Sequence, residues 1–240
     1  MTPLYYDFHL HSCLSPCGDD DMTPANIVGM AFLNGLDVIA LTDHNTCKNC
    51  AAAIHHGNNY GVTVIPGMEL TTAEEVHIVC LFPTLEDAMV FDAYVYEHLL
   101  PIKNREEIFG KQQIMNENDV VIGTVENLLI NATDIYFDDV FSLVESYNGI
   151  AFPAHVDKTS TSLLSNLGFV PPESTFTCAE IHSYKNLHSI QNDHPYFLKC
   201  NMLSSSDAHY LEDIRQAQYQ IYAESKEIKD ILKALRKIPE

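Results

Sequence analysis

The sequence predicts an α/β fold in which strands and helices alternate within one barrel-like domain. The first observation is a rhythm of short apolar runs, such as Val38–Leu41 and Val62–Ile65, separated by helix-length stretches. Runs that are apolar throughout are typical of parallel strands buried on both faces. The second observation is that six short apolar segments each end in, or carry, a histidine or a carboxylate. Because the strands of a parallel α/β barrel all end on one face, these polar side chains are expected to meet there.

Each element has its own signal along the chain. Residues Thr23–Gly35 predict a helix, because they begin with an N-cap hydroxyl and a proline and end at a glycine. The last expected helix, Ile228–Ile238, carries apolar residues at helical spacing. Further helices are expected over Ala51–Asn59, Val140–Tyr147 and Ser162–Leu167, and further strands over Val76–Phe82, Gly149–Pro153 and Phe176–Ile181, near Met202 and over Tyr219–Tyr222.

The alternation breaks between about residue 83 and residue 139. This stretch contains Ala93–Leu100, a polar turn at Asn116–Asp119 and the segment Asn131–Asp134. We interpret it as a helical insertion that forms a lid over the site, rather than as a second domain. A chain of 240 residues can fill one barrel domain, so residues 1–240 are expected to fold as a single domain.

The composition narrows the class of protein. Charged residues are 19% and hydrophobic residues 46% of the chain, as in an ordinary globular protein. No stretch approaches the roughly 20 apolar residues of a membrane span, and the N-terminus lacks the pattern of a signal peptide, so we expect a cytoplasmic protein with no membrane partner. The formal net charge of −20 repels nucleic-acid phosphates, so no duplex DNA partner is expected.

The polar residues at the strand ends are of the types that bind metal ions. Residues i and i+2 of an extended strand share a face, so Asp7, His9 and His11 point the same way. Two imidazoles can then hold one ion while Asp7 orients a ring. The whole set comprises His9, His11, Asp43, His44, Glu69, His77, His155, Asp207 and His209. Imidazole and carboxylate together suit zinc, manganese or iron, so the set predicts a site for several metal ions.

These residues stand in motifs that resemble those of the PHP superfamily, named for polymerase and histidinol phosphatase. In chain order the motifs are His9-Leu-His11, Thr42-Asp-His44, Gly67-Met-Glu69, His77, Pro153-Ala-His155 and Ser206-Asp-Ala-His209. The resemblance spans nearly the whole chain. It implies a distorted seven-stranded (β/α)7 TIM-like barrel, a centre of two or three divalent metal ions and, in most stand-alone members, phosphoesterase activity.

The resemblance also implies how the ligands are shared among the ions. The ligands of the first ion are matched by His9, His11, Glu69 and Asp207. Glu69 is expected to bridge to a second ion held by His77 and His155, and a third ion is expected at His44 and His209. The remaining ligand of the third ion lies in the loop after His11, which is longer here than in the common pattern. Asp19 is the best match, and Asp20, Asp21 and Cys17 are alternatives.

The resulting hypothesis is a metal-dependent phosphoesterase of the phosphatase or nucleotidase type. A metal-bound hydroxide would attack the phosphoester bond of a small phosphorylated metabolite or nucleotide, including a short oligonucleotide. Asp207, His209 and Glu69 are the expected catalytic residues, and Lys158 and Arg105 are candidates for contacting the substrate phosphate. Two alternatives stay open: an amidohydrolase-like enzyme that cleaves C–N or ester bonds, and a non-catalytic metal-binding regulatory module.

Two pairs of cysteines directly follow ligand histidines. Seven cysteines, an odd number, argue against a disulfide framework in a chain without an export signal. The paired residues are Cys13, Cys17, Cys47 and Cys50. Because consecutive parallel strands are usually neighbours, these four thiols are expected to meet in a second metal, iron–sulfur or redox site. Free thiols that only pack the loops are the alternative.

Overall fold

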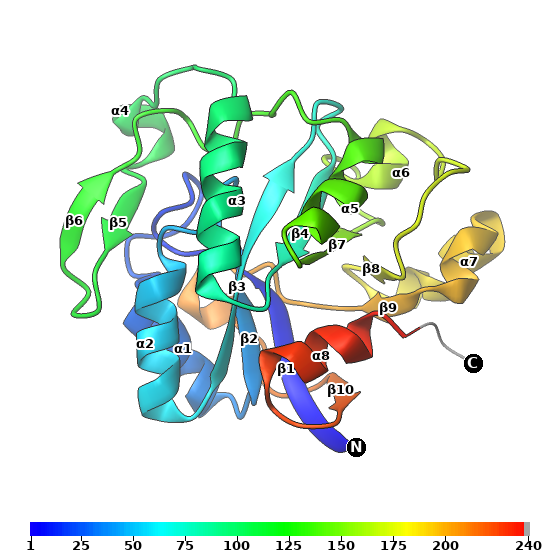
Figure 1. Cartoon of the computed structure of the whole chain (residues 1–240), viewed down its shortest axis with the longest axis horizontal. Helices are drawn as coiled ribbons and strands as arrows, with labels where there is room; N and C mark the ends of the chain where they lie inside the picture. The colour runs from blue at the N-terminus through cyan, green and yellow to red at the C-terminus, as the bar shows by residue number, and fades with distance from the viewer. Residues whose placement is uncertain (238–240) are drawn as a thin grey trace.

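The computed structural model describes residues 1–237, and Ile238 of the expected last helix lies outside them. The helices are α1 (Pro24–Leu33), α2 (Cys50–Tyr60), α3 (Leu85–His98), α4 (Glu106–Phe109), α5 (Phe137–Ser146), α6 (Leu163–Asn166), α7 (Leu187–Asp193) and α8 (Ile228–Leu235). The strands are β1 (Thr2–Leu10), β2 (Val38–Leu41), β3 (Thr63–Thr71), β4 (His77–Leu81), β5 (Gln113–Met115), β6 (Val121–Thr124), β7 (Ile150–Pro153), β8 (Cys178–Glu180), β9 (Asn201–Leu203) and β10 (Gln220–Ala223) (Figure 1).

A curled sheet of six strands forms the centre of the molecule, in the order β10-β1-β2-β3-β4-β7. β1, β2 and β3 are parallel, whereas β4 is antiparallel to both β3 and β7, and β10 is antiparallel to β1. β8 and β9 form a separate parallel pair. The α/β alternation is therefore confirmed, but the expectation of parallel strands throughout is wrong at β4 and β10, and a continuous seven-stranded barrel is not formed by strand pairing among the described residues.

The reversal of β4 follows from the length of its connection to β3. Only residues 72–76 join the two strands, and Thr71 pairs with His77. Parallel neighbours need a crossover of a dozen or more residues, so this short turn permits antiparallel pairing only. As a result, the start of β4 lies at the same edge of the sheet as the ends of β1, β2 and β3. His77 reaches that edge by opening a reversed strand.

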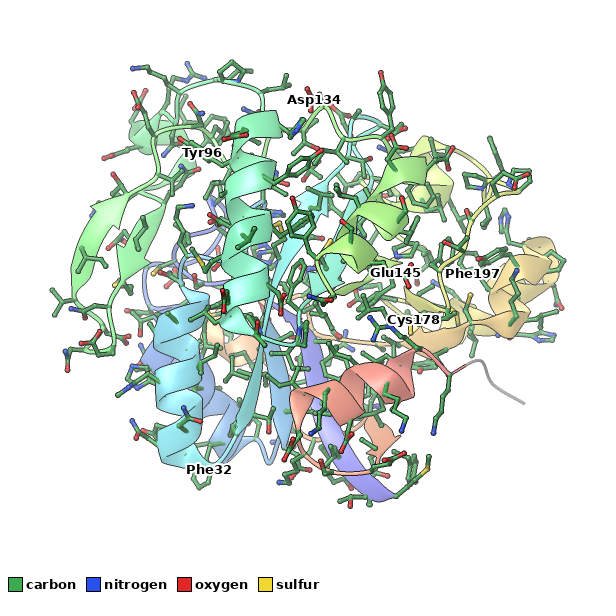
Figure 2. The ribbon with its side chains drawn as sticks, viewed as in Figure 1. Phe32, Tyr96, Asp134, Glu145, Cys178 and Phe197 are labelled. Carbon is green, nitrogen blue, oxygen red and sulfur yellow. The ribbon has the colours of Figure 1, made fainter. Side chains whose placement is uncertain are left out.

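The core lies on both faces of the curled sheet. Leu4, Tyr6 and Phe8 alternate along β1 and, with residues of the neighbouring strands, pack against the apolar side of α8. On the other face, a larger cluster joins the sheet to α1, α2, α3 and α5. Cys178 belongs to the core beneath α8, where its thiol lies 2.9 Å from the carbonyl oxygen of Leu235 (Figure 2).

The insertion between residues 83 and 139 is not helical throughout. It contains α3 and the short α4, then the hairpin of β5 and β6, and α5 begins at Phe137. Asn45, which follows β2, donates its side-chain amide to the carbonyl oxygens of Leu129 (2.7 Å) and Asn131 (2.9 Å). The insertion is thereby tied to the loop that carries His44. Within residues 1–237, no helix combines the length and the apolar character needed to cross a bilayer.

Candidate metal centre

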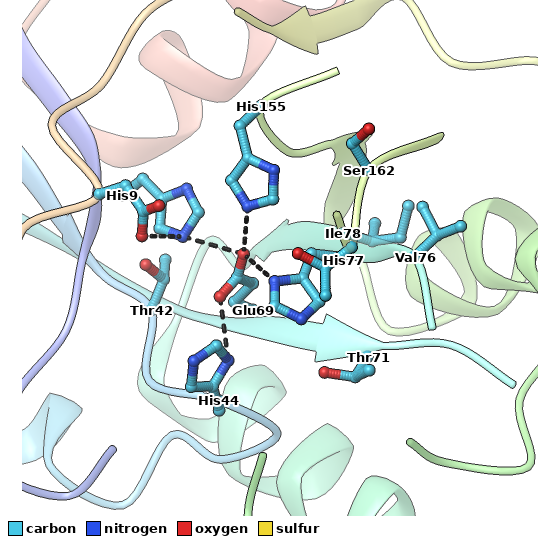
Figure 3. Close-up of polar contacts among 12 residues, drawn as sticks. His9, Thr42, His44, Glu69, Thr71, Val76, His77, Ile78, His155 and Ser162 are labelled. Carbon is cyan, nitrogen blue, oxygen red and sulfur yellow. Dashed lines mark hydrogen bonds and ion pairs between the residues drawn. The ribbon is translucent and has the colours of Figure 1, made fainter. Parts of the chain in front are cut away.

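Side chains from several elements converge where β1, β2 and β3 end (Figure 3). His9 lies near the end of β1, Glu69 near the end of β3, and His77 at the start of the reversed β4. His155 follows β7, and Asp207 follows β9. All five residues are buried or nearly so. The arrangement of the strands therefore gathers residues that lie nearly 200 positions apart in the sequence.

Glu69 is the centre of this cluster, because five imidazoles surround its carboxylate. Its Oε1 atom lies 2.8 Å from His77 Nδ1, 3.1 Å from His155 Nε2 and 3.2 Å from His9 Nε2. Its Oε2 atom lies 3.0 Å from His44 Nδ1 and 3.3 Å from His11 Nε2. Each carboxylate oxygen thus faces a different set of histidines, which is the geometry expected of a carboxylate that bridges two ions.

Asp207 supplies the second carboxylate of the cluster. Its Oδ1 atom lies 3.2 Å from His11 Nε2 and 3.4 Å from His9 Nε2, and its Oδ2 atom accepts a hydrogen bond from the Lys158 ammonium. Asp207 has a φ of +54° and His155 a φ of +30°, and residues other than glycine rarely adopt such positive φ values. Such backbone conformations persist only where the surroundings enforce them, and they concentrate at functional sites.

The charges of the cluster are strongly coupled. Burial alone would raise the pKa of Glu69, but His77, His9 and His44 hold it well below its usual range. Burial alone would lower the pKa of His11, yet hydrogen bonds with Asp207 and Glu69 raise it to about 9. The pKa of His44 is likewise raised to about 9, mainly by Glu69 acting against burial. Without metal, the site therefore retains protons that metal ions must displace.

His209 lies at the rim of the cluster and behaves differently. Burial and the neighbouring His11 lower its pKa to about 3. Its Nδ1 atom lies 2.8 Å from the carbonyl oxygen of Asp207, to which it donates, so Nε2 is the atom left as a ligand. The ring stacks on that of His11, with 4.2 Å between their centroids.

The residues present fit several divalent ions. Asp207 Oδ1 and His44 Nδ1 are buried and have charged neighbours within 3.2 Å, but neither makes a hydrogen bond of good geometry, and His9 Nε2 lies 3.1 Å from His11 Nε2. Ligand atoms within 4.8 Å of one another form three groups, which are His9, His11, Glu69 and Asp207; His44, Glu69 and His77; and His11, His44 and His209. The first group is the one expected from the sequence. Glu69 belongs to two groups, and His155 adjoins them through its 3.1 Å contact with Glu69.

Two expected metal ligands lie outside these groups: His155, which contacts Glu69, and Asp19, which lies in the loop after β1. The Asp19 Oδ1 atom accepts a hydrogen bond from the backbone of Asp21 at 2.9 Å, because the loop after β1 folds into consecutive tight turns. Asp20 is bonded to the side chain of Gln113 at 2.9 Å. Cys17, by contrast, lies next to the His44 side chain and contributes to raising the pKa of that imidazole. The Asp19 carboxylate thus stabilises the loop itself, and the Asp20 carboxylate ties the loop to the insertion.

The four cysteine thiols do not meet. Those of Cys47 and Cys50 both lie against the carbonyl oxygen of Gly67, at 3.2 Å and 3.5 Å. Cys13 faces the insertion, and Cys17 is exposed. Among the described residues, no group of three or more potential ligands contains a cysteine. The expectation that the four thiols meet is therefore wrong, because Cys47 and Cys50 face Gly67 whereas Cys13 faces Gln113 of the insertion. A metal or redox role for these cysteines stays a prediction.

Sequence reasoning missed Glu180 and misjudged Asp7. The Glu180 carboxylate lies 3.1 Å and 3.2 Å from His9 Nδ1, so it orients the ring that Asp7 was expected to orient. Asp7 instead accepts hydrogen bonds from the backbone of Ser206 (3.0 Å) and of His9 (3.4 Å). The available signal was a carboxylate inside the apolar run at Phe176–Ile181, since a buried charge requires a partner.

The two cationic candidates differ in position. Lys158 reaches Asp207 and also lines a cleft of about 550 Å³, whose other walls include Val156, Leu164 and Ile190. Arg105 precedes α4 in the insertion and is exposed. A role for Arg105 in binding phosphate stays a prediction.

Known proteins resemble this chain over different spans. A 5'-3' exoribonuclease of Haemophilus influenzae is 35% identical over 79 residues, which are 32% of this chain and 28% of that protein. The lesion-specific endonuclease EndoQ of Pyrococcus furiosus superposes on 99% of the chain with a TM-score of 0.69 and 17% identity. The chain covers 58% of EndoQ and thus spans only part of either protein.

A third similar protein has nearly the same length as this chain. It comes from Bifidobacterium adolescentis and is described as a candidate metal-dependent phosphoesterase. It is 16% identical, with a TM-score of 0.59, over 95% of this chain and 96% of its own. The solved structures support the fold alone at these identities. The PHP domain itself matches residues 7–236, which include every residue of the cluster around Glu69, and the chain therefore belongs to the PHP domain family.

Proposed function

We propose that this protein is a metal-dependent phosphoesterase acting on a small phosphorylated metabolite or nucleotide. The observation that carries the proposal is the placement of five imidazoles around the Glu69 carboxylate, beside a second carboxylate from Asp207. This donor set suits zinc, manganese or iron and has room for two or three ions. Bound ions of this kind would acidify a water molecule and neutralise the charge of the phosphoryl oxygens.

The residues divide the work by position. His9, His11, Glu69 and Asp207 would hold the first ion, as their mutual distances support. Glu69 would bridge to a second ion beside His77 and His155, and His44 with His209 would hold a third, with His11 next to them. His209 stands at the rim and keeps a low pKa of about 3, so it is neutral at physiological pH and is available as a ligand through Nε2.

Lys158 is proposed to bind the substrate phosphate. Its ammonium group lies on Asp207 Oδ2, between the cluster and the cleft of about 550 Å³. A lysine is a compact charge on a flexible stem, so it can turn from Asp207 to a phosphate without moving the backbone. The cleft would then hold the group attached to the phosphate. Its lining mixes apolar side chains such as Ile190 with polar ones such as Asn186.

The proposed substrates include nucleic acids. The net charge of −20 predicted that duplex DNA would be repelled, but an Endonuclease Q of the same fold has been solved with a 27-mer duplex, at a TM-score of 0.65 to this chain. A protein of this fold can therefore hold duplex DNA, and bound metal ions can invert the sign of the field inside an acidic protein's site. Nucleotides and short oligonucleotides remain the substrates that we propose, and duplex DNA belongs in the test.

The test is a hydrolysis screen of protein loaded anaerobically with zinc, manganese or iron, read as phosphate release from monoesters and as shortened products from oligonucleotides and duplex DNA. The panel contains phosphomonoesters, nucleotides, short oligonucleotides and duplex DNA, with amides and carboxylic esters as the competing class. We expect hydrolysis of at least one phosphoester and loss of that activity after chelation. Activity confined to amides or esters, or silence of the metal-loaded protein across the panel, would contradict the proposal.

Two lysine variants test whether Lys158 binds the substrate phosphate. Lys158→Ala is expected to lower kcat/KM by roughly 10- to 100-fold, because a hydrogen bond to a charged group is lost. Lys103→Ala is the matched control, since Lys103 pairs with Glu126 on the exposed surface of the insertion. Equal kcat/KM values for the two variants would remove Lys158 from the substrate site.

A further inference from the structure

The two histidines of the His9-Leu-His11 motif have different outer partners. Their Nε2 atoms face each other at 3.1 Å, toward Glu69 and Asp207. The outer nitrogen of His9 lies on the Glu180 carboxylate, whereas His11 Nδ1 lies 2.9 Å from the hydroxyl of Ser15. Ser15 is buried in the loop directly after β1. A neutral hydroxyl thus stands where the neighbouring histidine has a carboxylate.

The hydrogen bonds of Ser15 fix the direction of its contact with His11. The Ser15 hydroxyl donates its proton to Asp43 Oδ1 at 2.7 Å. The same oxygen accepts a hydrogen bond from the backbone N–H of His44 at 3.2 Å. A serine hydroxyl has only one proton, so toward His11 it can act only as an acceptor. His11 must therefore carry its proton on Nδ1, which leaves Nε2 of the neutral ring free of a proton.

Asp43 is committed to accepting. Its Oδ1 atom also accepts from the backbone N–H of Ser12, and its Oδ2 atom accepts from the Ser12 hydroxyl, both at 2.7 Å. The Ser12 hydroxyl in turn accepts from the side chain of Asn49 (2.9 Å) and the backbone of Leu14 (3.2 Å), so its own proton is also assigned to Asp43. Asp43 is almost completely buried and needs these donors. Both serine hydroxyl protons in this network are therefore donated to the Asp43 carboxylate.

We infer that Ser15 is a positioning residue of the metal centre, which relays the charge of Asp43 to His11 and holds His11 with Nε2 free and directed at the metal site. This inference rests on the proposed function only in assuming that the cluster binds metal ions. Histidines that ligate metals usually donate their other N–H to a carboxylate, a carbonyl or a water. Here the Ser15 hydroxyl, which donates to Asp43, accepts the N–H of His11. It also accepts the backbone N–H of His44 and so helps to position that expected ligand.

Ser12 provides a matched control for Ser15. Both hydroxyls are buried in the same loop, and both donate to Asp43 at 2.7 Å. The Ser12 hydroxyl contacts Asn49 and Leu14 but no imidazole. Ser12→Ala and Ser15→Ala therefore remove equivalent hydrogen bonds from Asp43, and only Ser15→Ala leaves His11 Nδ1 without its acceptor.

The experiment measures metal binding by the full chain without substrate. Metal-free wild type, Ser12→Ala and Ser15→Ala are titrated with Co²⁺ against a competing chelator, and the visible absorption of bound Co²⁺ is recorded. Ser15→Ala is expected to weaken binding by roughly 10- to 100-fold and to change the Co²⁺ spectrum. Ser12→Ala is expected to keep the wild-type affinity and spectrum, although urea unfolding should show both variants destabilised.

Equal losses of affinity in the two variants would overturn the inference, because the stability of the loop would then explain both. Unchanged binding in Ser15→Ala would overturn it as well. If Ser15→Ala does not fold, a measurement on the wild type tests the inference instead. Nitrogen chemical shifts of histidine-labelled, zinc-loaded protein are expected to show His11 protonated at Nδ1. A proton at Nε2 of His11 would refute the inference. Because no substrate is used, a failed hydrolysis screen leaves these outcomes unaffected.

Discussion

Glu69 is the residue whose replacement should affect the cluster most. It is the only carboxylate in the described part of the chain that lies within 3.3 Å of imidazoles from four strands and their following loops. Removing its charge would leave those imidazoles facing one another. Protonated imidazoles would then repel one another, and a bound cation would lose a negatively charged ligand that offsets its own charge.

Glu69→Gln is therefore expected to lower metal content more than His209→Ala. A bridging carboxylate serves two ions, whereas His209 stands at the rim and serves one. Elemental analysis of both variants after identical loading gives the stoichiometry, and circular dichroism checks that each is folded. Equal metal content in the two variants would remove the bridging role of Glu69.

Helices α1 and α2 offer a comparison at the scale of an element. The two helices contact each other, and each contains an interior glycine. A Cβ at Gly29 would have no atom within 4 Å, whereas a Cβ at Gly57 would lie 2.6 Å from both the carbonyl oxygen of Val62 and the side chain of Val64. Gly57 thus permits α2 to lie close to β3.

Gly29→Ala is expected to stabilise the protein by about 0.5–1 kcal/mol, because alanine loses less backbone entropy in a helix. Gly57→Ala is expected to destabilise it by about 1–3 kcal/mol, because the added methyl group overpacks the contact with β3. Urea unfolding of both variants beside the wild type measures the difference. Stabilisation by Gly57→Ala would show that α2 does not depend on this close approach.

The elements that the sequence predicted well are those with long or capped patterns. The runs that became β2 and β7 are apolar throughout, and Thr23 accepts a hydrogen bond from Asn26 as the expected cap of α1. An apolar run carries no direction, so the reversal of β4 could not be seen in it. The strands β5 and β6 are short, and Val121 and Ile122 are exposed, so they gave no alternation that would distinguish them from a loop.

The candidate site was predictable to a similar degree, for a physical reason. Histidines at strand ends converge because the sheet places them, and seven other expected ligands lie in the cluster with Glu69. Asp19 failed because its carboxylate bonds within its own turn, a choice that depends on the loop fold. Asp43 was expected in the metal-binding set, but its carboxylate accepts hydrogen bonds from Ser12 and Ser15 and belongs to none of the ligand groups. Ser15 stayed hidden because its partners are fixed by contacts between loops that lie far apart in the sequence.

The molecule as a whole should respond to pH through the charges of the cluster. In the metal-free fold, the pKa values of His11 and His44 are about 9, raised from 6.5. A raised pKa means that the folded state binds protons more tightly than the unfolded state. These groups therefore stabilise the fold fully below about pH 6.5, and this contribution is lost as the pH rises toward 9.

Metal-free protein is accordingly expected to lose stability between about pH 6.5 and pH 9, by up to about 1.4 kcal/mol per pH unit for each proton released. Zinc-loaded protein is the control and should show little change, because metal ions replace those protons. Urea unfolding with a chelator, or with zinc, at several pH values measures both. Rising stability of the metal-free protein over this range would contradict the assignment of the retained protons.

The separate pair of strands β8 and β9 is joined to the central sheet partly through residues of the cluster around Glu69. This pair shares no strand ladder with β1 or β7 in the described residues. Its link to β1 includes the bond between Glu180 and His9, and the backbone N–H of Asp207, just after β9, donates to the His9 carbonyl oxygen at 3.0 Å. Bound metal ions would add a further connection between β1 and the β8–β9 pair. Amide hydrogen exchange in β8 and β9 should then accelerate on chelation far more than in α1. In a cell short of metal, this side of the protein would open more often and would be cut more readily by proteases.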